Sequence, residues 1–99
     1  LDNHKLYFSK NGTFQNSGDP TSGATGTGSA FDLATSVAYS FGQSSNDSGT
    51  DPVYSWNFGN PPFTISSGNT DGNGFGNFEY AVPTGYLSLN TKNLAAVLA

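Results

Sequence analysis

Apolar residues alternate with polar ones along several short stretches of this chain of 99 residues. Such alternation places successive side chains on opposite faces of an extended strand. In residues 35–41 the apolar positions are Val37, Tyr39 and Phe41, and only Ser and Ala stand between them. The pattern predicts a half-buried strand over residues 35–41. In residues 53–58 the rings of Tyr54, Trp56 and Phe58 share one face in the same way, which makes these three residues the best core candidates.

A hairpin is predicted near the start of the chain. Residues 5–9 alternate and are followed by residues 10–15, in which Asn11-Gly12 stands between two aromatic-bearing stretches. Asn-Gly between such runs is the strongest short-range signal for a hairpin turn. The second strand should end at Gly18-Asp19-Pro20, because proline has no amide hydrogen to donate to a strand ladder. A loop rich in Gly, Ser and Thr is expected over residues 21–29.

The second half of the chain predicts further strands and turns, interrupted by Gly and Pro. The prolines before residues 63–65 allow only an edge strand or an extended arm there. The remaining expectations are a Gly-rich loop over 69–77, alternation at Phe78, Tyr80 and Val82, a turn at 83–85 and a last strand over 86–89. Residues 90–99 are compatible with a short helix or with a linker.

Composition agrees with an all-β chain and excludes several classes of function. Thirteen Gly and five Pro break any helical period, while the aromatic share of 14% supplies material for a core. The net charge of -4, with only three basic residues, removes the basic surface that nucleic acid requires. The chain has no cysteine, hence no disulfide or thiolate metal site, and no apolar run of the ~20 residues that a membrane span needs.

Three segments together carry a resemblance to a known family. They are residues 5–14 (KLYFSKNGTF) followed by 18–20 (GDP), residues 56–59 (WNFG), and residues 80–94 (YAVPTGYLSLNTKNL). In this order they resemble the C-terminal half of SPRY-like domains, which are concanavalin-type β-sandwiches found in many binding proteins. The resemblance implies an antiparallel jelly-roll-like sandwich with little or no helix. It also implies that the first segment is a strand pair, the second a buried strand and the third the closing strand.

The ending of the third segment resembles a subgroup found in phage and environmental viral proteins. This resemblance implies a phage structural or adhesion protein on capsid or tail, located in the virion. Its partners would be other virion subunits or a host-surface protein or glycan, in a homo-oligomer or a larger assembly. We expect residues 1–94 to form the C-terminal portion of the sandwich and residues 95–99 a linker or tail. The preceding half of the sandwich would come from missing sequence or from a neighbour.

No reactive constellation accompanies these strands, so catalysis is not expected. His4 is the single histidine and Glu79 the single glutamate, and no triad or nucleophile motif surrounds them. The six Asp residues stand mostly at turns, where hydrogen bonds to the backbone explain them. A strand-edge position is the better interpretation of His4. No cofactor and no metal are predicted.

One loop is similar to a calcium site but does not meet its requirements. Residues 71–76 alternate Asp and Asn and then place Gly sixth, whereas Val82 stands where an EF-hand needs a bidentate Glu. A looser site formed by Asp71, Asn73 and Asn77 is an alternative to a turn with positive φ angles at its glycines, and the turn is preferred.

Recognition would involve exposed aromatic and acidic residues on loops at the edge of the sandwich, since loops on a rigid scaffold commonly carry binding. The alternative to a virion module is a carbohydrate-binding module that uses loop aromatics and a calcium ion. The candidate binding residues are Tyr54, Trp56, Asp47, Asp51, Asp71, Asn73 and Asn77.

Overall fold

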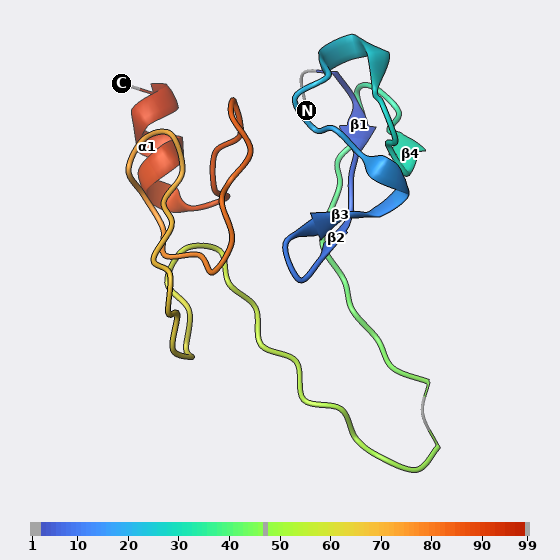
Figure 1. Ribbon diagram of the computed structural model, residues 1–99, viewed down its shortest axis with the longest axis vertical. Helices are drawn as coiled ribbons and strands as arrows, with labels where there is room; N and C mark the ends of the chain where they lie inside the picture. The colour runs from blue at the N-terminus through green and yellow to red at the C-terminus, as the bar shows by residue number, and fades with distance from the viewer. Residues whose placement is uncertain (1–2, 47, 99) are drawn as a thin grey trace.

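The computed structural model describes residues 3–46 and 48–98 and shows a chain with little helix and small antiparallel sheets. Figure 1 shows an N-terminal lobe (residues 3–33) and a C-terminal lobe (residues 59–98), joined by a long connecting arm (residues 34–46 and 48–58). The low-helix prediction is confirmed, whereas these sheets do not confirm a jelly-roll sandwich. The elements are β1 (Lys5–Leu6), β2 (Ser9–Lys10), β3 (Thr13–Phe14), β4 (Phe31–Asp32), two 3-10 turns (Gln15–Ser17 and Gly23–Thr25) and α1 (Thr91–Leu98).

The predicted hairpin is present in the N-terminal lobe. Strands β2 and β3 pair with Ser9 opposite Phe14, and the turn between them is Asn11-Gly12. Both turn residues have positive φ, 50° and 80°, as a type I′ turn requires. The ladder is shorter than predicted, because the chain enters a 3-10 turn directly after Phe14.

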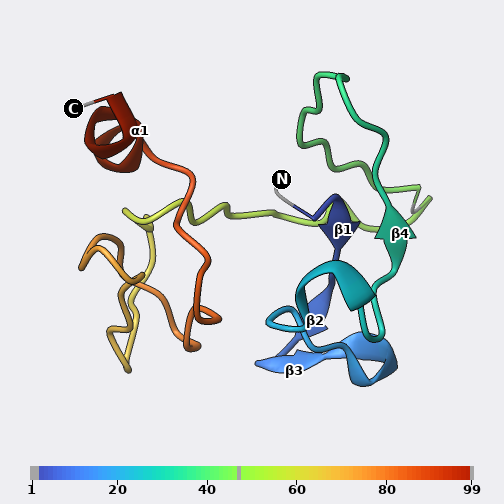
Figure 2. The same ribbon diagram turned by 90° about the horizontal axis from the view of Figure 1, so that it is seen from above.

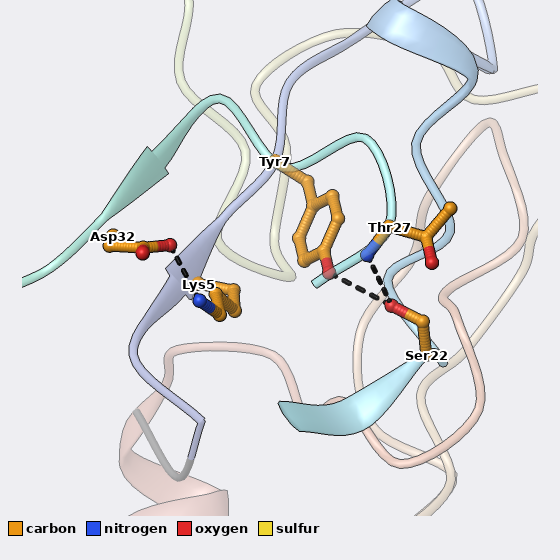
Figure 3. Close-up of polar contacts among 5 residues, drawn as sticks. All are labelled: Lys5, Tyr7, Ser22, Thr27 and Asp32. Atoms are coloured by element: carbon orange, nitrogen blue, oxygen red, sulfur yellow. Dashed lines mark hydrogen bonds and ion pairs between the residues drawn. The ribbon is translucent and has the colours of Figure 1, made fainter. Parts of the chain in front are cut away.

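The assignment of residues 5–9 to that hairpin was wrong in part. Strand β1 instead pairs with β4, with Lys5 opposite Asp32 and Leu6 opposite Phe31. The Lys5 ammonium lies 2.7 Å from Oδ1 of Asp32 across this pair (Figure 3). No sequence pattern predicted β4, because a strand of two residues is too short to show alternation.

The loop between β3 and β4 is closed by side-chain hydrogen bonds. Ser22 Oγ accepts the Thr27 amide at 2.9 Å and lies 3.2 Å from the Tyr7 hydroxyl (Figure 3). The Asp19 carboxylate accepts the amide and hydroxyl of Thr21. Polar contacts thus shape a loop whose residues are too small to bury an apolar core.

The four longer strands predicted from alternation are not formed. Residues 35–41 and 53–58 lie in the connecting arm as unpaired chain, and Ser36 has a φ of 58° that bends its start. Residues 78–82 and 86–89 are likewise irregular apart from a single bridge at Phe78. Among the described residues, no backbone-to-backbone hydrogen bond involves residues 35–46 or 50–58. A strand requires a partner, and alternation alone does not provide one.

The C-terminal lobe consists of turns closed by one helix. The Asn69–Phe78 bridge closes the predicted Gly-rich loop, and the Tyr86 amide donates to the Pro83 carbonyl at 3.1 Å in the predicted turn. Helix α1 resolves the open alternative for the last ten residues, and it stands at the outer end of this lobe in Figure 2. The Asn93 amide donates to Oδ1 of Asn90 at 3.1 Å, which is an N-cap bond.

The two lobes are in contact around Pro20 and Gly12. The Tyr86 hydroxyl donates to the Pro20 carbonyl at 2.8 Å, although the two residues are 66 positions apart. Beside this bond, Gly12 lies so close to the Tyr80 ring that an added Cβ would be 2.6 Å from Cδ1. The hairpin turn therefore carries the contact between lobes.

Candidate functional site

The described part of the chain has no buried hydrophobic side chain. Its accessible surface is 7567 Å², whereas a compact monomer of 10.3 kDa exposes about 5,400 Å². The excess is apolar in part, because Phe, Tyr, Trp, Val and Leu side chains are exposed in both lobes and in the arm. An exposed apolar surface of this extent marks a site of interaction.

The densest part of this surface is a group of three rings, here called the aromatic cluster: Phe41, Trp56 and Phe58. The Trp56 and Phe58 rings are stacked, with centroids 5.6 Å apart and planes 12° apart. Phe41, which precedes residue 47 in the arm, contacts both rings, with its centroid 6.4 Å from that of Trp56 and 5.8 Å from that of Phe58. The three side chains remain 68%, 43% and 40% exposed. The prediction that Trp56 and Phe58 form a core was therefore wrong, since their rings pack on each other and leave one face open.

The other predicted binding residues of the arm lie near this cluster in sequence. Tyr54 is 45% exposed, and Asp51 is exposed as well. Asp47 lies outside the described residues. The structure shows no contact that brings Tyr54 or Asp51 into the aromatic cluster.

A second, polar centre organises the C-terminal lobe around Asp71. Its Oδ1 accepts the amides of Asn73 and Phe75, each at 3.0 Å. Its Oδ2 accepts the amide and hydroxyl of Ser88 at 2.9 Å and 2.6 Å, and Nδ2 of Asn93 at 2.7 Å. Asp71 and Asn93 are the two buried polar residues of the described chain, only 5% and 6% exposed. We call these five residues the Asp71 network.

Hydrogen bonding keeps the Asp71 carboxylate ionised. The hydroxyl of Ser88, followed by Asn93 and the amides of Ser88 and Phe75, lowers the pKa of Asp71 far below its usual range, against the opposing effect of burial. Each donor stabilises the charged form. The carboxylate therefore persists at any pH where the protein would function.

The Asp71 network favours a turn over a calcium site in residues 71–77. Both oxygens of Asp71 are occupied by donors, and Nδ2 of Asn73 donates to Oδ1 of Asn93 at 2.9 Å. Gly74 and Gly76 have positive φ, 79° and 96°, as the preferred turn requires. Asn77 lies outside the network, exposed, and its carbonyl accepts Nδ2 of Asn57. The three predicted ligands thus do not converge on one point.

Ser88 and Asn93, whose side chains complete the Asp71 network, were not predicted from the sequence. They lie 17 and 22 positions from Asp71. The one signal available was a set of asparagines flanking the start of α1, and it does not indicate a partner.

The other features of the described chain are an open groove and one short helix. In residues 3–46 and 48–98, no group of three or more His, Cys, Asp or Glu side chains is arranged to hold a metal ion. An open groove of about 590 Å³ lies between the lobes, lined by Phe14, Asp19 and Tyr80 among others. None of the helices in the described residues has the length and apolar character to cross a membrane.

Comparison with known proteins gives no relative for this arrangement. A scan against protein-family models, a search of curated proteins and a search of solved structures each returned no match. The SPRY-like resemblance therefore stays a prediction, based on the three sequence segments. The exposed apolar surface is the structural feature of the described residues that bears on function.

Proposed function

We propose that this chain is a non-catalytic structural or adhesion module of a phage particle. In this proposal it forms part of a SPRY-like jelly-roll sandwich on capsid or tail, and it contacts neighbouring subunits or a host surface. The observation that carries the proposal is the apolar side chains left exposed where no apolar core is buried. Such side chains reach a favourable environment only when another surface covers them.

Charge and chemistry support the same proposal. Only 10% of the residues are charged, and the surface between the aromatic residues is mostly Ser, Thr, Asn and Gly. The cores of protein interfaces are rich in aromatic residues and poor in charged ones. Phe41, Trp56 and Phe58 fit the composition of such a core, and we assign them as its centre.

The direct test is the presence of the chain in purified particles. We expect an antibody against the chain to detect it in particles banded by density from a culture that carries the gene. Phe41→Ser should reduce incorporation about tenfold or more, as loss of a buried anchor does. The matched control is Phe63→Ser, which alters another exposed ring (44%, against 68% for Phe41) that makes no ring contact with the cluster within the described residues. Particles without the chain, or equal incorporation of Phe41→Ser and the wild type, would overturn the proposal.

A carbohydrate-binding module is the second candidate, and one observation favours it. The Trp56 ring is exposed and held by stacking on Phe58, so its position is fixed before any ligand arrives. Rigid aromatic faces provide contact area at low entropic cost. On a glycan array, saturable binding that Trp56→Ala abolishes would establish this candidate. Flat binding across the array, with incorporation into particles, would retire it.

A further inference from the structure

The first limb of the connecting arm, residues 34–46, contains a segment whose backbone groups are unpaired within the described chain. Residues 37–41, here called the edge segment, form no backbone-to-backbone hydrogen bond within the described chain. Its apolar side chains Val37, Tyr39 and Phe41 are 55%, 49% and 68% exposed. Figures 1 and 2 show the chain leaving β4 and running out into the connecting arm. The amide and carbonyl groups of the edge segment are therefore open to another strand.

Nothing in the sequence protects this edge. Residues 34–46 contain no charged residue and no proline. Proteins usually block open strand edges with charges, prolines or bulges, because an unblocked edge pairs with other chains. An apolar edge without such protection is suited to pairing.

We propose that the edge segments of two copies of this chain pair as antiparallel strands around a two-fold axis through Tyr39. The inference rests on the proposed function and names the partner that covers part of its exposed surface. Strand addition at an open edge is a recurrent mode of recognition, with main-chain hydrogen bonds providing affinity. An interface between identical copies is self-complementary about its two-fold axis.

The register follows from the bend at Ser36. Its φ of 58° excludes extended backbone at that residue, so strand pairing begins no earlier than Val37. Directly opposite residues in an antiparallel pair point to the same face. With Tyr39 on the axis, Val37 faces Phe41 of the second copy and Tyr39 faces its own counterpart. Aromatic and β-branched residues form favourable cross-strand pairs, so this register keeps every apolar residue with an apolar partner.

Area and charge favour a second copy over a different protein. The chain exposes about 2,200 Å² more than a compact monomer would, whereas a standard interface takes only about 800 Å² from each partner. The edge segment has no charge, so two copies do not repel each other there. For the same reason, it has no charge pattern by which a different partner would be selected.

The absence of cysteine permits a direct test of the register. In the proposed pair, Ala38 of one copy faces Ser40 of the other, at a Cα separation of about 4.5–5.5 Å, which a disulfide can span. Two Ala38 residues are diagonal neighbours about 7–8 Å apart, which is too far. We expect oxidised mixtures of Ala38→Cys and Ser40→Cys full-length chains, distinguished by a size tag, to form the mixed disulfide. Each variant alone is the matched control and should cross-link about tenfold more slowly.

Sedimentation tests the proposed pairing without cross-linking. Wild-type chain should sediment as a dimer at high concentration, and Tyr39→Glu should be monomeric because two like charges would meet on the axis. Tyr54→Glu, a similar change outside the edge segment, should remain dimeric.

The inference is overturned if the wild type is monomeric, if the mixed disulfide forms no faster than the controls, or if Ala38→Cys links mainly to itself. A monomer that still enters particles would overturn the pairing and leave the proposed function intact. A cross-linked dimer that never enters particles would overturn the proposed function and leave the pairing intact.

Discussion

At the scale of single residues, Asp71 does in the C-terminal lobe what apolar side chains do in most domains. Its five hydrogen bonds hold a turn, the Ser88 segment and α1 together. The turn itself could be predicted, since Asp followed by Asn and Gly favours such geometry. The contacts with Ser88 and Asn93 could not, because no local rule specifies which distant donors a carboxylate will meet.

Replacing Asn93 by Asp should break the Asp71 network. Asn93→Asp keeps the shape but places a carboxylate oxygen where Nδ2 now lies, 2.7 Å from Oδ2 of Asp71. Two carboxylates at this distance cannot both stay ionised, so the variant's apparent pKa is raised. At pH 7 we expect the Ser88 amide to exchange with solvent about tenfold faster or more than in the wild type. Below that raised pKa the pair gains a proton and a hydrogen bond, so the difference should shrink as the pH falls.

Asn77→Asp is the matched control, because Asn77 is exposed and outside the network. At pH 7 and at pH 4, the Ser88 amide of Asn77→Asp should exchange at the same rate as in the wild type. Unchanged exchange in Asn93→Asp at pH 7 would show that Asp71 does not organise this lobe. The protection of the Ser88 amide in the wild type, which is its exchange rate relative to an unfolded peptide at the same pH, should change little between pH 7 and 4, because the lowered pKa of Asp71 keeps its stabilising contribution until the pH falls further.

At the scale of elements, local signals were confirmed and non-local ones were not. The Asn11-Gly12 turn and the Pro83 turn need only their own residues, and both are present. The strands over 35–41 and 53–58 had equally clear alternation, yet they are unpaired. Alternation reports which side of a strand would be buried, but pairing depends on a partner that the pattern does not name.

Gly12 links the hairpin to the other lobe, and an added methyl group should disturb both. Gly12→Ala introduces a Cβ 2.6 Å from the Tyr80 ring at a φ of 80°. Left-handed backbone at a residue with a side chain costs about 1–3 kcal/mol, and the ring must also move. We expect a loss of this size or more in the free energy of unfolding measured in urea.

Substitutions at two other glycines distinguish the backbone strain of Gly12→Ala from its steric conflict with the Tyr80 ring. Gly85 has a φ of 88° with nothing near an added Cβ, so Gly85→Ala should cost only the backbone strain. Gly42 has open space and no positive φ, so Gly42→Ala should be neutral or slightly stabilising. Equal effects of Gly12→Ala and Gly85→Ala would show that the Tyr80 contact is unimportant.

At the scale of the whole molecule, the chain is longer and more open than its size requires. Its radius of gyration is 15.1 Å, whereas a compact domain of 99 residues would have about 12.6 Å. The incomplete sandwich that the resemblance implies stays a prediction. Two lobes could not be predicted, because the residues in contact, Tyr86 with Pro20 and Tyr80 with Gly12, are far apart in the sequence.

Removing the Tyr86 hydroxyl should let the lobes separate. Cysteines introduced at Ala24 and Thr91, one in each lobe, can carry a pair of dyes because the chain has no cysteine of its own. In single-molecule energy transfer, at concentrations too low for pairing of copies, Tyr86→Phe should give a longer and broader distance distribution. Tyr39→Phe is the matched control, since the Tyr39 hydroxyl donates only to the nearby Ala34 carbonyl.

The same bond predicts an alkaline transition. Burial, followed by the charges of Tyr7 and Asp19, raises the pKa of Tyr86, so the folded chain favours the neutral phenol that donates to Pro20. The stabilising contribution of the hydroxyl is complete below the ordinary tyrosine pKa of about 10 and is lost as the pH rises through the raised value. The wild type should therefore acquire the distance distribution of Tyr86→Phe at alkaline pH, while the variant changes less. A wild-type distribution that is unchanged across this range, or that equals Tyr86→Phe already at pH 7, would mean that the lobes are held together by other contacts.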